Sequence, residues 1–361
     1  MKIIFILPDI TTRGGVERVT SVLANVFVKK GFDVTIISLF KRMSVPAFIL
    51  DEKICLTFIT EDDYNLNGGR IRLLPMQWNA FCKLKRFLDY NQYDLIIAQC
   101  FLPALFVFLS GYAKKSVVCD HFKYELYKQP ILTLRNYVYN KFIQVVTLTQ
   151  TDADKYKQVL KQVRVIPNIS PFSVSDFSNL SHKRIIAVGR LHRQKGFDLL
   201  LDAVKDTFRN FPDWRLDIYG EGELLDELKK QRNSFHLQSY VDFKGYTSSV
   251  KAEMLRSSIF VLSSRYEGLP MVLLEAMSCA LPIVSFKCPE GPADLLSNNV
   301  GYLVEAENTF ALRTALEEMM KDSFLRESYA DREKIAIKEY SADSILKKWM
   351  ELFRELGLLG K

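Results

Sequence analysis

Short apolar runs alternate with segments of helical length along almost the whole chain of 361 residues, and this alternation constrains the fold more than any other feature. In the first half the runs lie at residues 3–7, 34–40, 54–59, 95–98, 117–119 and 143–148, and in the second at 184–188, 214–219, 241–243, 259–262 and 282–286. Few of them alternate polar with apolar residues, which is typical of parallel strands covered on both faces. The pattern therefore predicts an α/β architecture with doubly wound sheets.

The series breaks once, at residues 167–179, a stretch rich in Ser, Pro and Asn that is typical of a linker. We therefore predict two Rossmann-like domains, residues 1–170 and 180–341, with a cleft between them. Residues 342–359 have the pattern of a final helix.

The excess of positive over negative charge lies entirely in the first half of the chain. Residues 1–170 hold 23 Lys and Arg against 14 Asp and Glu, whereas the remaining residues hold 26 against 28. This asymmetry indicates an anionic partner for the first half. Residues 77–90 predict a helix that carries Lys83, Lys85 and Arg86 beside aromatic residues. Such a helix suits an anionic membrane surface or a lipid-diphosphate acceptor, and a solvated helix face is an equally good interpretation. Nucleic acid is not expected, since no recognition motif accompanies the charge.

The compartment signals favour the cytoplasm. The six cysteines include no CxxC pair and show no zinc-ligand spacing with His, so reduced thiols and no structural metal are expected. The most apolar stretch, residues 95–109, is too short for a membrane span and contains Gln99 and Pro103. We expect a cytoplasmic protein, in peripheral contact with the inner face of the cell membrane if the basic helix binds lipid.

Two strand-to-helix turns have the residue types that bind phosphate. Gly14 and Gly15 follow the first strand, where paired glycines let the backbone approach an anion. Gly189 follows the first strand of the second half, and Arg190 and Lys195 come after it, ahead of a predicted helix. Two cations beside helix N-termini suit a diphosphate leaving group. A flexible turn and a solvated basic loop are the simpler interpretations.

A third turn combines two carboxylates with a helix start. Glu267 lies in the loop after the strand at 259–262, and Pro270 suits the first position of a helix that begins near Met271. Glu275 lies one turn inside that helix. Carboxylate oxygens accept hydrogen bonds from vicinal hydroxyls, so the pair suits a sugar and a ribose. Glu267 alone would equally well complement the helix dipole.

Together these segments resemble glycosyltransferase family 4 (GT4). The resemblance rests on Glu267-x7-Glu275, on Gly14-Gly15-x-Glu17-Arg18 and on Gly189-Arg190-Leu191-x3-Lys195-Gly196-Phe197-Asp198, and residues 273–284 strengthen it. It implies the GT-B fold, with the acceptor on the first domain, the nucleotide sugar mainly on the second, and the last helix, about residues 342–361, crossing back to the first.

The resemblance also implies roles for single residues. Glu267 would bind donor-sugar hydroxyls and Glu275 the ribose diol, while Arg190 and Lys195 would hold the diphosphate. His121, after the strand at 117–119, would touch the transferred sugar. The implied catalytic set is His121, Arg190, Lys195 and Glu267. The other implied donor-binding residues are Gly14, Gly15, Gly189, Tyr246 beside the base, Gly268, Leu269, Pro270, Met271 and Val272.

The function expected from the resemblance is hexosyl transfer with retention of configuration, in cell-surface polysaccharide synthesis. The donor is a nucleoside-diphosphate sugar, with UDP the most frequent carrier, and the acceptor is a hydroxyl of a glycan or a polyprenyl-linked oligosaccharide. No cofactor or metal is expected, and Asp152 and Asp154, although spaced like a metal-binding DxD motif, read better as helix-start residues. A UDP-sugar epimerase of the same fold and a non-catalytic nucleotide-sugar-binding protein remain as alternatives.

Overall fold

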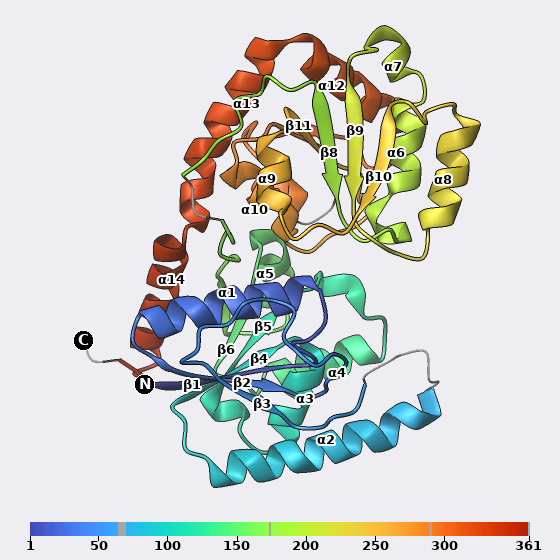
Figure 1. Cartoon of the computed structure of the whole chain (residues 1–361). Coiled ribbons are helices and arrows are strands. Elements are labelled where there is room, and N and C mark those ends of the chain that lie inside the picture. The colour runs from blue at the N-terminus through green and yellow to red at the C-terminus, as the bar shows by residue number, and fades with distance from the viewer. Residues whose placement is uncertain (64–69, 173–174, 289–290, 360–361) are drawn as a thin grey trace. The chain divides into compact units, whose positions relative to one another are not determined.

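The computed structural model describes residues 1–63, 70–172, 175–288 and 291–359, with the side chains of residues 70–73 excepted (Figure 1). The chain divides into two compact units. Unit 1 comprises Met1–Ile169 and Ala342–Lys361, and unit 2 comprises Ser170–Ser341. The division falls inside the stretch at 167–179 interpreted above as a linker, of which residues 173 and 174 lie outside the described residues.

Unit 1 is built on a seven-stranded sheet in the order β3-β2-β1-β4-β5-β6-β7, and all of its strand pairs are parallel. The strands are β1 (Lys2–Leu7), β2 (Asp33–Ser38), β3 (Cys55–Phe58), β4 (Leu95–Gln99), β5 (Ser116–Asp120), β6 (Gln144–Thr147) and β7 (Val163–Val165). The helices are α1 (Gly15–Lys29), α2 (Arg70–Tyr90), α3 (Phe101–Leu109), α4 (Ile131–Tyr139), α5 (Gln150–Lys157) and α14 (Ala342–Glu355), with the 3-10 turns η2 (Ala113–Lys115) and η3 (Tyr124–Leu126).

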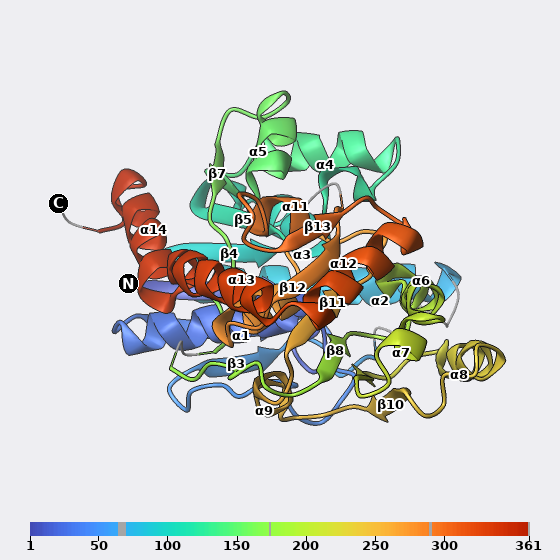
Figure 2. The same cartoon turned by 90° about the horizontal axis from the view of Figure 1, so that it is seen from above.

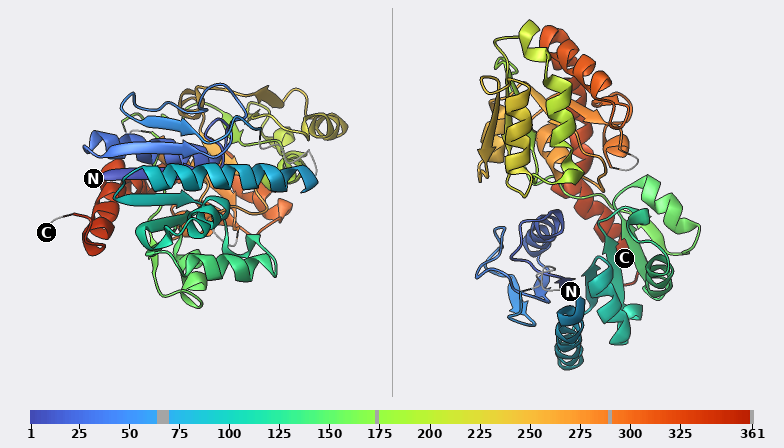
Figure 3. Two further views of the ribbon diagram at one scale, coloured as in Figure 1. Left: turned by 90° about the horizontal axis from the view of Figure 1, so that it is seen from below. Right: turned by 90° about the vertical axis from the view of Figure 1, so that its right-hand side faces the viewer.

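Helices cover both faces of this sheet, as the continuous apolar strands require. Residues of α1 and α14 share one core with the sheet, and residues of α2, α3, α4 and α5 share the other. The final helix is amphipathic, and the apolar side chains it buries follow the helical period: Ile345, Trp349, Leu352 and Phe353. Figure 3 (left) shows α2 lying lengthwise across the outside of unit 1.

Unit 2 repeats the plan with six parallel strands in the order β10-β9-β8-β11-β12-β13. The strands are β8 (Arg184–Val188), β9 (Arg215–Tyr219), β10 (Val241–Gly245), β11 (Ile259–Leu262), β12 (Ile283–Phe286) and β13 (Tyr302–Val304). The helices are α6 (Phe197–Val204), α7 (Thr207–Asn210), α8 (Leu225–Ser234), α9 (Val250–Leu255), α10 (Met271–Ser278), α11 (Pro292–Leu295), α12 (Thr309–Lys321) and α13 (Ser323–Ala336), with the 3-10 turns η4 (Arg193–Lys195) and η5 (Ile337–Tyr340).

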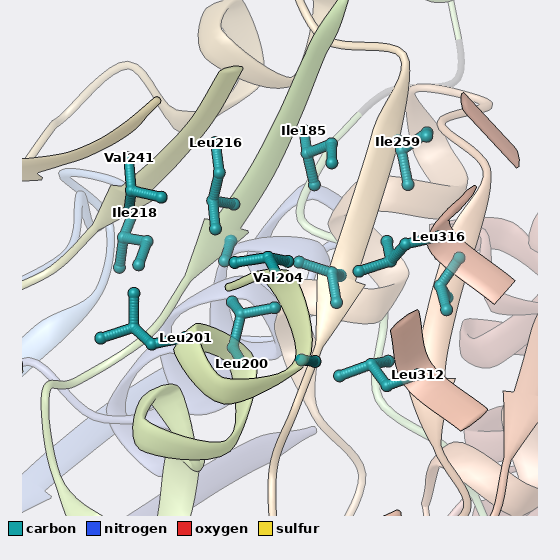
Figure 4. Packing of buried hydrophobic residues seen from close by; sticks show 14 of the residues in the cluster. Ile185, Leu200, Leu201, Val204, Leu216, Ile218, Val241, Ile259, Leu312 and Leu316 are labelled. Carbon is teal, nitrogen blue, oxygen red and sulfur yellow. The ribbon is translucent and has the colours of Figure 1, made fainter. Parts of the chain in front are cut away.

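The main core of unit 2 lies between its sheet and α6, α8 and α12. Figure 4 shows side chains of α6 and α12 directed at those of the strands: Leu200, Leu201, Val204, Leu312 and Leu316 against Ile185, Leu216, Ile218, Val241 and Ile259. In Figure 2, α12 and α13 run beside one another, and the two helices are also in contact.

The predicted fold class is confirmed, since the chain forms two doubly wound parallel sheets. Each sheet has a point where the strand order reverses, between β1 and β4 in unit 1 and between β8 and β11 in unit 2. Ligands of such sheets bind at the carboxyl ends of the strands at these points.

The structure also departs from the sequence pattern in places. It adds the short strands β7 and β13, and it begins α2 at Arg70, so that this helix runs through Pro75. Within the described residues, no helix is both long and apolar enough to cross a membrane.

Candidate active site

Two of the charged residues predicted for unit 2, Lys195 and Glu267, meet where β8 and β11 end. Lys195 belongs to η4, after β8, and Glu267 lies in the loop after β11. Lys195 Nζ lies 2.6 Å from Glu267 Oε1, and the two side chains are 19% and 6% exposed. Two residues that the sequence analysis assigned to different parts of a donor therefore form an ion pair with one another.

Close backbone packing positions Lys195. The 3-10 turn ends at Gly196, whose φ of 62° is in the left-handed region. A Cβ on Gly196 would lie 2.0 Å from the carbonyl oxygen of Ser263, so no other residue fits. The stem of Lys195 lies on Gly189, where a Cβ would be 3.3 Å from the lysine Cδ. Both glycines thus allow the lysine to reach the end of β11.

The loop after β11 is tied to the same turn. Ser264 Oγ donates a hydrogen bond of 2.6 Å to Glu267 Oε1, the same oxygen that bonds Lys195. Arg265 donates from both terminal nitrogens to Asp198, at 2.9 and 2.6 Å, and its backbone N–H donates to Gln194 O at 2.8 Å. Such a bidentate pair is geometrically specific. The Arg265–Asp198 pair joins the loop that carries Glu267 to the first turn of α6, which directly follows the turn of Lys195. Neither residue was predicted as a site residue.

The helix after Glu267 begins at Met271, as expected, but Pro270 is its N-cap and not its first helical residue. The prediction for Pro270 was wrong by one position, because its ψ of 114° is extended. Leu269, Pro270 and Met271 are buried, and Gly268 and Val272 are half-buried. Glu275, in the second turn of α10, is 1% exposed. The first amides of α10 have no side-chain cap.

Two predicted donor residues lie apart from this pair. Arg190 is exposed, and no hydrogen bond or ion pair of its guanidinium occurs among the described residues. Tyr246 follows the end of β10 and is half exposed. Neither is bonded to Lys195 or Glu267 in the described part of the chain.

In unit 1 the paired glycines begin α1, with Gly14 as its N-cap. A Cβ on Gly14 would lie 2.3 Å from Glu17 Oε2, so the glycine makes room for the carboxylate in the first turn. Nothing lies within 4 Å of the equivalent point on Gly15. The protein's own packing therefore accounts for Gly14 and leaves Gly15 open to the surface.

His121 lies directly after β5 and is half-buried. Its Nε2 is hydrogen-bonded to Oε1 of Gln99, the last residue of the neighbouring strand β4. Burial lowers the pKa of the imidazole to about 4, so the ring is neutral at pH 7. Because Gln99 Oε1 accepts, Nε2 carries the proton and Nδ1 is an acceptor; Nδ1 is buried and has no hydrogen-bond partner among the described residues. Gln99 was not predicted as a site residue, although a polar side chain at the end of an apolar strand was a usable signal.

The remaining predicted residues lie on helices. Asp152 lies in the first turn of α5, but the helix cap is Thr149, whose Oγ1 accepts from the Asp152 N–H at 3.1 Å. The Asp152 carboxylate instead accepts from Thr149 Oγ1 at 3.0 Å and from Tyr124 N at 2.9 Å. Asp154 instead accepts from Gln150. Lys83, Lys85 and Arg86 are exposed on α2; Lys85 Nζ lies 3.3 Å from Asp89, and Arg86 lies over the Tyr90 ring.

Two family models match nearly all of this chain. The model for Glycosyltransferase Family 4 matches residues 13–169, and the model for Glycosyl transferases group 1 matches residues 173–339. The chain is 29% identical to the amylovoran biosynthesis glycosyltransferase AmsD of Erwinia amylovora, over 97% of this chain and 99% of that protein. It is 26% identical, over 99% of each chain, to an α-1,4-N-acetyl-D-galactosaminyltransferase of Campylobacter jejuni whose name specifies a diphospho-undecaprenol-linked acceptor.

Solved structures share the fold. S. aureus TarM, in complex with fondaparinux, α-GlcNAc-glycerol and UDP, superposes with a TM-score of 0.81 at 16% identity, over 98% of this chain and 99% of that one. Anabaena HepE, in complex with UDP and glucose, superposes with a TM-score of 0.77 at 18% identity, over 98% and 100%.

Proposed function

Because the chain belongs to glycosyltransferase family 4, with the GT-B fold, we propose that it is a retaining hexosyltransferase acting on a nucleoside-diphosphate sugar, with UDP as the first carrier to test. The ion pair of Lys195 and Glu267 carries this proposal. It places a cation and a carboxylate at the strand-order reversal of unit 2, beside the uncapped amides of α10. A sugar diphosphate needs these two kinds of partner, one for phosphate oxygens and one for hydroxyls.

The proposed reaction needs no nucleophile from the protein. The bond between the sugar C1 and the diphosphate oxygen breaks, the acceptor oxygen bonds C1 on the same face, and the acceptor proton passes to the departing phosphate. Catalysis then rests on position and on charge, with Lys195 and Arg190 stabilising the negative charge that develops on the diphosphate. Glu267 holds donor-sugar hydroxyls, Glu275 the ribose diol, and His121 contacts the sugar.

A donor panel tests the activity. The purified protein is incubated with UDP-, GDP- and ADP-sugars, and free nucleoside diphosphate is measured. We expect release from one donor class, and a KM for that donor about tenfold higher in Glu275→Ala, as expected for one lost charged hydrogen bond. Exposed Glu339→Ala is the control. An epimerised nucleotide sugar without diphosphate release would identify an epimerase, and binding without any turnover would identify a non-catalytic protein.

We propose an acceptor that is a glycan or a polyprenyl-linked oligosaccharide at an anionic membrane surface, as in cell-surface polysaccharide synthesis. The exposed Lys83, Lys85 and Arg86 on α2 support the membrane contact, together with the exposed apolar Trp78 and Leu74 on the same helix. Each cation near an anionic surface is worth about 1 kcal/mol, so changing all three to Gln should weaken vesicle binding roughly 100-fold.

The matched control changes Lys29, Lys30 and Lys53, which are exposed on and near α1, to Gln. Sedimentation with anionic and with neutral vesicles gives the measurement. Equal binding to both kinds of vesicle, or equal losses in the two triple variants, would contradict the membrane proposal.

We also propose that no metal or cofactor takes part, since Lys195 and Arg190 supply the cationic charge. Asp152 and Asp154 bond to different residues of their own region and do not converge. Activity should be unchanged within about twofold in excess chelator; a loss that Mg²⁺ or Mn²⁺ restores would refute the proposal.

A further inference from the structure

A complete ion pair is buried at the end of β5, beside His121. Asp120 is 3% exposed and Arg135, from α4, is fully buried. Arg135 Nη1 lies 3.7 Å from Asp120 Oδ2. The same carboxylate accepts from the Tyr156 hydroxyl and from the Phe122 backbone N–H, the latter at 3.3 Å. Two hydrogen bonds and one nearby cation therefore hold this short side chain, while Nε and Nη1 of Arg135 are buried without a hydrogen-bond partner among the described residues.

Four tyrosine rings enclose the guanidinium of Arg135. Its Cζ lies 4.8 Å from the ring centres of Tyr124 and Tyr156, 5.6 Å from that of Tyr127 and 5.8 Å from that of Tyr139. Cations are attracted to aromatic faces at these distances. The rings come from η3, its following loop, α4 and α5, so the cage joins every element around the end of β5.

Stability alone does not explain this arrangement. Moving two charges out of water costs several kcal/mol per ion, and well-packed apolar residues of similar volume are often at least as stabilising. Burial raises the pKa of the Asp120 carboxyl, although Arg135 and Tyr156 act in the opposite direction. The position of the ion pair indicates a link to His121, because Asp120 directly precedes that residue in the chain.

The backbone on the other side of His121 is also constrained. Cys100, which follows Gln99, is held at φ 69° and ψ −177°, a region that residues with a Cβ rarely adopt. Its N–H donates to Cys119 O at 2.8 Å, which joins the ends of β4 and β5. The backbone N–H of His121 in turn contacts the Cys100 thiol. Gln99 is therefore fixed as the partner of the imidazole Nε2.

We propose that Arg135 is a positioning residue for His121: by holding the Asp120 carboxylate, it fixes the end of β5 and keeps the imidazole in one orientation, with Nε2 bonded to Gln99. The inference rests on the proposed function only in the contact of His121 with the sugar. Loss of Arg135 leaves Asp120 without its cation, which raises the pKa of this carboxyl further and weakens it as the acceptor for Tyr156 and Phe122. The other titratable groups around this point are Glu17, Cys100, Cys119 and Tyr139.

The test reads the imidazole directly. The chain has only four histidines, so ¹⁵N spectra of the rings are simple, and His121→Gln assigns the signal. Wild type should show one neutral tautomer with the proton on Nε2. In Arg135→Met the signal should change to mixed tautomers, and kcat should fall about 10- to 100-fold while the donor KM stays within twofold. Arg135→Lys, which keeps the charge, should restore part of both.

A milder pair of variants covers the case in which Arg135→Met does not fold. Tyr156→Phe removes one hydroxyl that bonds Asp120, whereas Tyr124→Phe keeps a ring at the same 4.8 Å and removes a hydroxyl that bonds Asn136. Only Tyr156→Phe should alter the His121 spectrum and lower kcat, by about three- to tenfold. An unchanged tautomer in the Arg135 and Tyr156 variants, or equal effects of the two Tyr→Phe changes, would overturn the inference. If the Arg135 and Tyr156 variants show the spectral change but His121→Gln transfers sugar normally, the sugar contact is refuted and the positioning of His121 by Arg135 stands.

Discussion

In both sheets the candidate residues follow the carboxyl ends of strands, but the two units differ in how they treat charge there. In unit 2 a partly exposed lysine bonds to a buried carboxylate, Lys195 to Glu267. In unit 1 the exposed edge offers a neutral imidazole, and the charges of Asp120 and Arg135 are buried behind it. On the proposed function the paired charges of unit 2 exchange partners when the donor binds, whereas His121 keeps its bond to Gln99, with Nδ1 buried and without a hydrogen-bond partner among the described residues. The strand ends of unit 2 therefore offer charges that can pair with a charged ligand, whereas those of unit 1 hold a neutral imidazole in a fixed geometry.

The largest effect should come from removing the cation of unit 2. Lys195→Ala takes away the charge that we propose stabilises the departing diphosphate, and loss of one such group costs roughly 10²–10³ in kcat. Steady-state release of nucleoside diphosphate gives the measurement. Lys205→Ala is the matched control, because Lys205 also pairs with a carboxylate of unit 2, at 2.9 Å from Asp202. Near-normal turnover in a folded Lys195→Ala protein would show that Lys195 does not stabilise the donor diphosphate.

His121 should leave a pH signature in the stability of the protein. Its pKa of about 4 lies below the usual 6.5, so the unfolded chain binds more protons between these values. Stability is then complete above pH 6.5 and falls as the pH drops toward 4, by at most about 3 kcal/mol. Buried Glu333 has a raised pKa and acts with the opposite sign, losing stability as the pH rises. The difference between wild type and His121→Gln in urea unfolding isolates the first effect.

Exposed His236→Gln serves as the control for that comparison. If the stability difference between wild type and His121→Gln is the same at pH 4.5 and pH 7, His121 is not held neutral, and the contrast between the two edges disappears.

The partner exchange in unit 2 predicts opposite changes in binding and catalysis. Glu267→Gln frees Lys195 and removes a negative charge near the diphosphate, so UDP should bind about three- to tenfold more tightly. Transfer should fall, because the amide is a weaker acceptor for sugar hydroxyls. Calorimetry with UDP and steady-state kinetics measure the two effects, and weaker UDP binding would contradict the exchange.

A last pair of variants separates backbone contact from backbone strain. Gly196 and Gly245 have φ of 62° and 71°, but a Cβ on Gly196 meets Ser263 O at 2.0 Å, while nothing lies within 4 Å of that point on Gly245. Both Gly→Ala variants incur the left-handed strain of about 1–2 kcal/mol, and Gly196→Ala should lose roughly 1–3 kcal/mol more. Equal losses in thermal unfolding would mean that the turn carrying Lys195 is less tightly held than described.

The sequence predicted the long features of this chain and missed those that depend on tertiary contact. Apolar runs such as residues 3–7 and 259–262 identify buried strands, because their pattern is local. The three-residue strands β7 and β13 are too short to show a pattern. Glu267 and Lys195 were found by motif, yet their bond was not foreseen, since 72 residues separate them.

Arg135 is a clearer example of a feature that depends on tertiary contact and cannot be predicted from a local pattern. It lies in a short helix whose pattern gives no sign of a buried cation, and its four tyrosines converge only once β5, α4 and α5 are packed. The resemblance to GT4 supplied the roles expected for single residues, including His121. It gave no account of what holds that histidine in place.

The most direct test of the account follows the stereochemistry of the released sugar. The best donor from the panel, with an α-linked sugar, is incubated with wild type in D₂O, and ¹H NMR spectra are taken before the hemiacetal equilibrates. Water or a simple alcohol replaces the acceptor, so the natural acceptor need not be known. The account predicts that the α anomer appears first, and that Lys195→Ala slows its appearance at least 100-fold. First appearance of the β anomer would contradict a retaining transfer at this site.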